Sequence, residues 1–249
     1  MARDEQWLLE EKYGGRKTAA FEADRERLAA GEPLAYVIGH QPFLGLTIRL
    51  DSRPLIPRPE TEWWTEQLLN SLTRAEPPTR FLDLCAGSGA IGCAALARLP
   101  GACVSFGEID PAHEATILKN IRGNGLDESR TDIRIGDLFE PFPGMRFDVI
   151  AANPPYIPSI RTLDPSVALH EPAQALFAGD DGLAVIRRIA LKLAEHLAPD
   201  GEAWIEIDSA HAAAACALFT AQGFAADVRT DQYGAPRIIV CKHTRARSA

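Results

Sequence analysis

Strand-like and helix-like segments alternate regularly from Arg80 to the end of the chain. Short apolar runs typical of buried strands cover residues 81–84, 102–109, 133–135, 147–152, 203–207, 224–228 and 237–241. Helices are expected at residues 90–98, 111–120, 183–197 and 210–221. This alternation predicts an α/β fold with a doubly wound, mostly parallel sheet of seven strands. The last two strands have no helix between them, so we expect them to form an antiparallel hairpin at one edge.

The segments before this region have a different organisation. Residues 1–30 are charged and Ala-rich, and we expect two short helices that form an arm packed on the main domain. Residues 31–76 contain a Gly- and Pro-rich loop, an alternating stretch that predicts a β-hairpin, and a helix beginning near Pro59. Pro77 and Pro78 mark the expected boundary, after which residues 77–249 form the main domain.

Composition restricts the classes of protein that this chain can represent. With a net charge of −8 and a pI near 5.3, a broad nucleic-acid-binding face is not expected. The five cysteines are scattered, without a CxxC pair or a His/Cys cluster, which favours a reducing compartment and predicts neither disulfides nor a metal site. No apolar run approaches the length of a membrane span, and no signal-peptide core is present. We therefore expect a cytoplasmic protein.

A glycine-rich turn joins the first strand of the expected sheet to its helix, with the sequence Asp-Leu-Cys-Ala-Gly-Ser-Gly at residues 83–89. Such glycines let a ligand approach the backbone at a helix N-terminus, although they could equally serve only a tight turn. Residues 87–92 also satisfy the dinucleotide pattern GxGxxG. Asp83 would repel a pyrophosphate but could pair with an ammonium group, and no Lys or Arg lies in this turn. These features favour S-adenosylmethionine over NAD.

Two further carboxylates are expected at the ends of the next strands. Asp110 follows the second strand and could accept the ribose hydroxyls of a nucleoside, or it could cap the helix that begins at Pro111. Asp137 follows the third strand and could meet an adenine amino group, or it could belong to an ordinary turn. Together with Asp83, they match an ammonium, a ribose and an adenine in order along one edge.

The sequence Asn153-Pro154-Pro155-Tyr156 directly follows the fourth expected strand. It places a side-chain amide at the carboxyl edge of the sheet, where open α/β sheets bind ligands. The prolines keep the segment out of a helix and leave its carbonyl oxygens free to accept hydrogen bonds. Such a site suits a planar NH₂ group, as in a carboxamide or the exocyclic amine of a base. The alternative is a Pro-rich loop that only caps a strand. Farther along, Glu171 could supply a site carboxylate or lie in a loop turn.

These motifs resemble those of class I S-adenosylmethionine-dependent methyltransferases, and within them the protein glutamine-N5 methyltransferases (the HemK/PrmC family). The similarity covers about residues 31–242 and is concentrated in residues 33–39, 43–46, 55–62, 83–89, 153–156, 170–172 and 179–183. The resemblance implies a Rossmann-like methyltransferase sheet. It also implies transfer of a methyl group to the amide nitrogen of the Gln in the Gly-Gly-Gln motif of peptide chain release factors, with S-adenosylhomocysteine as the product.

The resemblance also implies roles for individual residues. Asn153 and the Pro154 carbonyl would accept both hydrogens of the substrate amide, and Tyr156 would pack against that amide or the cofactor. The expected cofactor-binding residues are Asp83, Cys85, Ala86, Gly87, Gly89, Asp110, Asp137, Leu138 and Asn153. The expected substrate-binding residues are Asn153, Pro154, Pro155, Tyr156, Arg58, Glu60 and Glu171.

Two positions depart from the family pattern. Cys85 stands where the family has its first loop glycine, a mild change if this residue keeps an ordinary φ. Only about thirty residues precede the shared region, where family members usually carry a helical docking domain. We expect cofactor binding and chemistry to be retained, and the mode of docking stays open.

Other functions stay open at this stage. A sister group acts on a ribosomal protein, and adenine-N6 methyltransferases of RNA or DNA share the Asn-Pro-Pro-Tyr motif. A catalytically silent binding module and a nicotinamide oxidoreductase are further alternatives. The favoured prediction is a monomeric enzyme whose partner is a release factor, without stable nucleic-acid or membrane binding.

Overall fold

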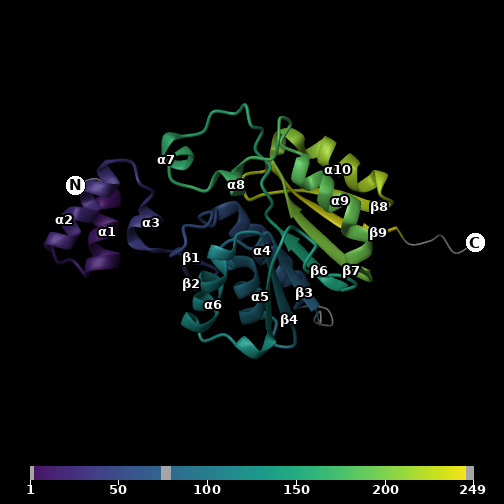
Figure 1. The fold of residues 1–249 in the computed structure, drawn as a ribbon, viewed down its shortest axis with the longest axis horizontal. Coiled ribbons are helices and arrows are strands. Elements are labelled where there is room, and N and C mark those ends of the chain that lie inside the picture. Colours follow the sequence, from purple (N-terminus) through teal and green to yellow (C-terminus); the bar gives the residue numbers. More distant parts are fainter. Residues whose placement is uncertain (1–2, 74–79, 245–249) are drawn as a thin grey trace, which may run out of the picture.

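The structure is a computed structural model that describes residues 3–73 and 80–244. In this part of the chain, seven strands form one sheet in the order β5-β4-β3-β6-β7-β9-β8 (Figure 1). Five neighbouring strands are parallel: β3 Arg80–Leu84, β4 Cys103–Glu108, β5 Thr131–Ile135, β6 Phe147–Ala152 and β7 Leu197–Glu206. β8 Phe224–Thr230 and β9 Pro236–His243 are antiparallel, with β9 paired to β7. The predicted fold class and its edge hairpin are therefore confirmed.

Helices cover both faces of the sheet, because side chains of successive strand residues point to opposite faces. One face packs against α4 Pro59–Leu72, α5 Ala90–Arg98 and α6 Glu114–Gly123, and the other against α9 Ala184–His196 and α10 Ala212–Ala221 (Figure 1). In β3, Phe81 belongs to the first core, whereas Leu82 and Leu84 belong to the second. The remaining short elements are α7 Pro165–Ala168, α8 Ala173–Leu176, η1 Pro111–His113, η2 Glu128–Arg130 and η3 Ser209–His211.

The N-terminal helices form a small lobe of three helices, one more than the sequence analysis predicted for the arm. They are α1 Arg3–Tyr13, α2 Ala19–Ala29 and α3 Leu34–Ile38, and they lie together at one end of the molecule (Figure 1). Leu8, Leu9, Phe21 and Val37 form a separate buried cluster. The difference arises because α3, which follows the predicted arm, adds Val37 to the few apolar residues of α1 and α2.

Contacts of Tyr36 and Glu32 help to attach this lobe to the main domain. The Tyr36 ring belongs to the main core, and its hydroxyl donates to the Pro54 carbonyl at 2.7 Å. Glu32 accepts hydrogen bonds from Arg27 at 2.7 Å and from Arg53 at 2.8 Å. The predicted hairpin is present as β1 His40–Phe43 and β2 Leu46–Arg49. The predicted boundary at Pro77 and Pro78 lies outside the described residues.

The ion pairs of Glu32 predict a pH-dependent contribution to stability. Hydrogen bonds from Arg27, and then from Arg53, lower the pKa of Glu32 from 4.5 to about 2. A lowered folded-state pKa stabilises the protein above pH 4.5, and the contribution is lost as the pH falls toward 2. The free energy of unfolding of Glu32→Gln should therefore lie below that of the wild type near neutral pH, and the gap should close toward pH 2. Urea titrations measure the gap. Glu66→Gln, whose carboxylate faces Arg98 at 3.7 Å on the surface, should show little gap at any pH.

Close packing between α5 and β4 predicts a second effect on stability. A Cβ added to Gly92 would clash with Cε1 of Phe106, whose ring is fully buried. Gly92→Ala should therefore lower the free energy of unfolding by about 1–3 kcal/mol in denaturant titrations. Gly123→Ala is the matched control, because nothing lies within 4 Å of the added carbon. If Gly92→Ala were as stable as Gly123→Ala, the close packing of Gly92 against Phe106 would be contradicted.

Candidate functional site

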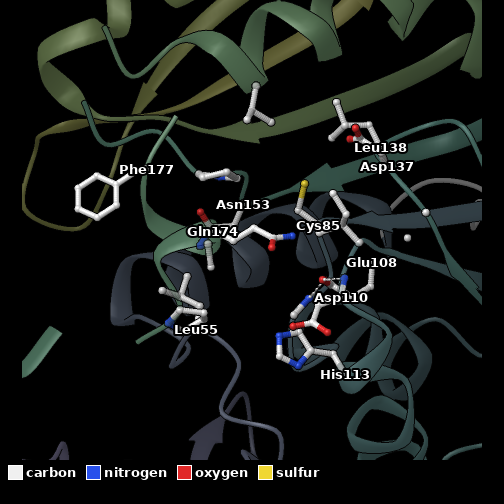
Figure 2. A pocket seen from close by; sticks show the side chains of 18 of the residues that line it. Leu55, Cys85, Glu108, Asp110, His113, Asp137, Leu138, Asn153, Gln174 and Phe177 are labelled. Atoms are coloured by element: carbon white, nitrogen blue, oxygen red, sulfur yellow. Dashed lines mark hydrogen bonds between the residues drawn. The ribbon is translucent and has the colours of Figure 1, made fainter. Parts of the chain in front are cut away.

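A cavity of about 290 Å³ lies at the carboxyl ends of β3, β4, β5 and β6 (Figure 2). Parallel pairing brings these four strand ends to one edge of the sheet. The predicted site residues that line it are Cys85, Gly87, Asp110, Asp137, Leu138, Asn153 and Pro155. Lining residues that the sequence analysis did not identify include Leu55, Glu108, His113, Gln174, Phe177 and Arg188.

The glycine-rich turn has unusual backbone geometry. Gly87 and Gly89 have φ values of 54° and 76°, and Cys85 has a φ of 62°. The condition that Cys85 keeps an ordinary φ is therefore not met, since it occupies the left-handed region that favours glycine. Leu138 also has a positive φ, of 50°. Two residues that line the cavity are thus held in conformations that side chains rarely adopt.

Asp83 lies behind this turn and does not line the cavity. Its Oδ2 accepts the Gly92 N–H at 2.8 Å, while the buried Oδ1 has no partner among the described residues. Burial raises the pKa of Asp83 well above its ordinary value. One oxygen therefore holds the start of α5, and the other has no donor in the part of the chain that the structure describes.

Glu108 takes the place that the sequence analysis gave to Asp110. β4 ends at Glu108, not at Ile109 as predicted, and Ile109 is 46% exposed. Glu108 lines the cavity and accepts the backbone N–H of Gly87 at 2.7 Å and of Asp110 at 2.9 Å (Figure 2). Asp110 caps η1 by accepting the Ala112 N–H at 2.9 Å. An acidic residue inside the apolar run was the signal for Glu108, and it was missed because the strand was predicted too long.

Asp137 lies on the cavity wall, separated from Glu108 (Figure 2). Its Oδ2 accepts a hydrogen bond from Arg188 at 2.7 Å. Arg188 belongs to α9, and it also lines the cavity. The glycine-rich turn contains no basic residue. Arg188 is brought to the cavity by the packing of α9.

Asn153 is connected to a fully buried carboxylate. Its Nδ2 donates to Thr61 Oγ1 at 3.1 Å, and Thr61 donates in turn to Glu206 Oε2 at 2.7 Å. Trp64 Nε1 donates to the same oxygen at 2.7 Å, and the Tyr156 hydroxyl donates to Oε1 at 3.0 Å. Glu206 is 1% exposed, and burial raises its pKa although these three donors oppose the shift. The signal for Glu206 was an acidic residue between two isoleucines of a buried strand.

Tyr156 lies behind the cavity, since it is not among the lining residues. Burial, together with the adjacent Glu206, raises the pKa of Tyr156 well above its ordinary value. The backbone after it is held by Ile157, which donates to Leu176 and accepts from Ala178, each at 2.9 Å. A Cβ at Gly182 would lie 2.4 Å from the Tyr156 carbonyl oxygen, so only glycine fits there. Among the described residues, no donor is hydrogen-bonded to the Pro154 carbonyl.

Glu171 joins the loop that follows this motif to the segment before α4. Its Oε1 accepts from Arg58 Nη2 at 2.6 Å, and its Oε2 accepts the Ile56 N–H at 3.1 Å. Neither Arg58 nor Glu171 lines the cavity, although the adjacent Leu55 and Pro172 do. Glu60 lies half-buried in the first turn of α4 and also does not line the cavity.

Two other kinds of feature are absent from residues 3–73 and 80–244. No group of three or more His, Cys, Asp or Glu side chains is placed there to hold a metal ion. None of the helices in that part of the chain has the length and apolar character needed to cross a membrane.

Comparisons with known proteins give consistent results. The family model described as conserved hypothetical protein 95 matches residues 49–188. A release factor glutamine methyltransferase of Deinococcus radiodurans is 36% identical over 226 residues, which cover 90% of this chain and 77% of that protein. A Pyrococcus furiosus methyltransferase structure has a TM-score of 0.60 at 15% identity, covering 90% of this chain and 100% of its own. The T. thermophilus 16S rRNA N2 G1207 methyltransferase, in complex with AdoMet and guanosine, has a TM-score of 0.54 at 18% identity, covering 82% of this chain and 50% of its own. The two structures support the fold alone.

The contact between Arg58 and Glu171 predicts a large effect on stability. The Glu171 side chain is 1% exposed, so Arg58→Met would leave a buried carboxylate without its counterion. The free energy of unfolding should fall by about 3 kcal/mol in denaturant titrations. Arg187→Met is the matched control, because Arg187 and Asp181 are 46% and 54% exposed, and it should cost less than about 1 kcal/mol. Equal losses in the two variants would contradict a structural role for the buried pair.

Proposed function

Since this chain belongs to the family of release factor glutamine methyltransferases, we propose that the cavity at the edge of its sheet carries out the family's reaction. The methyl group of S-adenosylmethionine is transferred to the side-chain amide nitrogen of the Gln in the Gly-Gly-Gln motif of a release factor. The observation that supports this most directly is Asn153, which lines the cavity while its Nδ2 is bonded to Thr61. This arrangement leaves Oδ1 as an acceptor for an amide N–H.

The charged groups around the cavity fit S-adenosylmethionine, which supplies an electrophilic methyl group on a positively charged sulfur. Glu108 and Asp110 suit ribose hydroxyls, and Asp137 suits an adenine amino group. The unpartnered Oδ1 of Asp83 suits a donor beside the glycine turn. Acidic groups in this number favour a cationic ligand over a pyrophosphate, and Arg188 is already paired with Asp137. Cys85, Ala86, Gly87, Gly89 and Leu138 would shape the backbone around the ligand.

An amide nitrogen is a weak nucleophile, because its lone pair is delocalised into the carbonyl. Asn153 Oδ1 and the Pro154 carbonyl would accept the two amide hydrogens, which fixes the nitrogen and adds electron density to it. Proline lacks a backbone N–H, so neither Pro154 nor Pro155 offers a competing donor. The proton becomes acidic as the N–C bond forms and leaves to water, so no general base acts before methyl transfer.

Tyr156, Arg58 and Glu171 would act from behind the cavity wall. Tyr156 is bonded to Glu206, and Glu171 to Arg58, so these residues would hold the motif and its loop in place. Glu60, in the first turn of α4, would contact the protein substrate directly. We also propose a monomer that acts in the cytoplasm without stable nucleic-acid binding, because the chain is acidic and its five cysteines are free.

Asn153→Ala tests the proposed reaction. Removing the acceptor should lower kcat by about 100-fold or more, while the Kd for S-adenosylmethionine changes by less than about threefold. Mass spectrometry of the Gly-Gly-Gln peptide measures the transfer, and calorimetry measures cofactor binding. Asn124→Ala is the control, since Asn124 contacts Thr47 in the hairpin and does not line the cavity.

Three results would contradict the proposal. A near-normal kcat in Asn153→Ala would remove the assigned role of this residue. Transfer by the wild type to a ribosomal protein or to RNA, but not to the release factor, would change the substrate. Tighter binding of NAD than of S-adenosylmethionine would change the cofactor.

A further inference from the structure

The side-chain amide of Asn153 can point into the cavity in two ways. Its oxygen and nitrogen branches are nearly equal in size, but one accepts hydrogen bonds and the other donates them. The proposed function, on which this inference rests, requires the oxygen to face the substrate. A rotation of 180° would present an NH₂ group to another NH₂ group, and the substrate could not bind productively. Some contact outside the cavity must therefore select one orientation.

The contacts of Thr61 provide this selection. Thr61 lies in the first turn of α4 and is 3% exposed. A threonine hydroxyl carries a single hydrogen, which Thr61 donates to Glu206 Oε2 at 2.7 Å. Toward Asn153, the Thr61 hydroxyl can therefore only accept a hydrogen bond. It accepts this bond from Asn153 Nδ2 at 3.1 Å. In the rotated amide, Oδ1 would face an oxygen that has no hydrogen left to donate.

The direction of the Thr61 hydroxyl is fixed in turn by Glu206. The two carboxyl oxygens of Glu206 accept hydrogen bonds from three donors, and one of these donors is an indole N–H, which can only donate. Trp64 Nε1 donates to the same Oε2 at 2.7 Å, which confirms that atom as an acceptor, and the Tyr156 hydroxyl donates to Oε1 at 3.0 Å. Glu206 is 1% exposed and Trp64 is 0% exposed, so water does not compete for these bonds.

We propose that Thr61 and Glu206 are positioning residues, which orient the Asn153 amide with its oxygen toward the substrate. They act as one directional chain from Glu206 through Thr61 to Asn153. Neither residue lines the cavity, so neither is a catalytic residue.

Thr65 supplies a matched control for this chain of hydrogen bonds. It lies one turn after Thr61 in α4 and is 0% exposed. Its Oγ1 has no hydrogen-bond partner among the described residues. Thr61→Val and Thr65→Val therefore remove the same atom from the same helix at similar burial, but only the first removes a contact with Asn153.

The experiment compares both variants and Thr61→Ser with the wild type, using a release factor and S-adenosylmethionine. Thr61→Val should lower kcat about tenfold. Losing one hydrogen bond of ordinary strength would reduce the population of Asn153 side chains in the productive orientation by about this factor. Thr65→Val should stay within about twofold of the wild type, and Thr61→Ser, which keeps the hydroxyl, should recover most of the loss. The ¹⁵N NMR signals of the Asn153 side chain should shift in Thr61→Val and stay in place in Thr65→Val. Equal kcat values in the two valine variants, with unchanged Asn153 signals, would overturn the proposal.

Two further outcomes keep this proposal separate from the proposed function. If the wild type does not methylate a release factor, the reaction is wrong, yet the NMR comparison still tests the orientation of Asn153. If the wild type is active and Thr61→Val behaves like Thr65→Val, the reaction stands and the positioning role is wrong. Should Thr61→Val fail to fold, Thr61→Ala against Thr61→Ser gives the same comparison with smaller side chains.

Discussion

Parallel pairing of β3 with both β4 and β6 is the constraint on which the rest of the site depends. It brings the glycine turn, Glu108 and Asn153 to one edge, although they come from different parts of the chain. The helices on both faces bury the sheet, so this edge is where backbone and side-chain polar groups can meet a ligand. The acidic groups and the amide then divide the cavity into a part that suits a cationic nucleoside and a part that suits an NH₂ group.

The sequence was sufficient to predict the sheet, its edge hairpin and several residues on the cavity wall, such as Asp137 and Asn153, because strand periodicity and turn chemistry are local signals. Glu108 was not identified, because the strand was predicted one residue too long and Asp110 was taken as the acidic residue that follows it. Local patterns do not fix where a strand ends. Arg188 and Thr61 could not have been predicted in this way, because each reaches the site only through tertiary packing. For Glu206, an acidic residue in a buried strand was a local signal, but its partners could not be predicted from it. The left-handed backbone of Cys85 also departs from local preference, as strained positions near functional sites often do.

Three of the buried carboxyl groups around the site are satisfied in different ways. Glu206 accepts three donors without a direct counterion, Glu171 is paired with Arg58, and Asp83 keeps one oxygen unpartnered. Full satisfaction makes the first two suitable for holding neighbouring segments rigidly. The incomplete satisfaction of Asp83 is instead what a position close to a bound ligand would show.

The long sequence separations within the Asn153 network affect when the site can form during synthesis. Thr61 precedes Asn153 by 92 residues and Glu206 by 145 residues. A growing chain therefore contains the complete Asn-Pro-Pro-Tyr motif well before β7 has left the ribosome. Until β7 joins the sheet, nothing fixes the Thr61 hydroxyl, and the amide of Asn153 is free to rotate. The positioning that we propose for Asn153 is therefore completed only after β7 has been made and has joined the sheet.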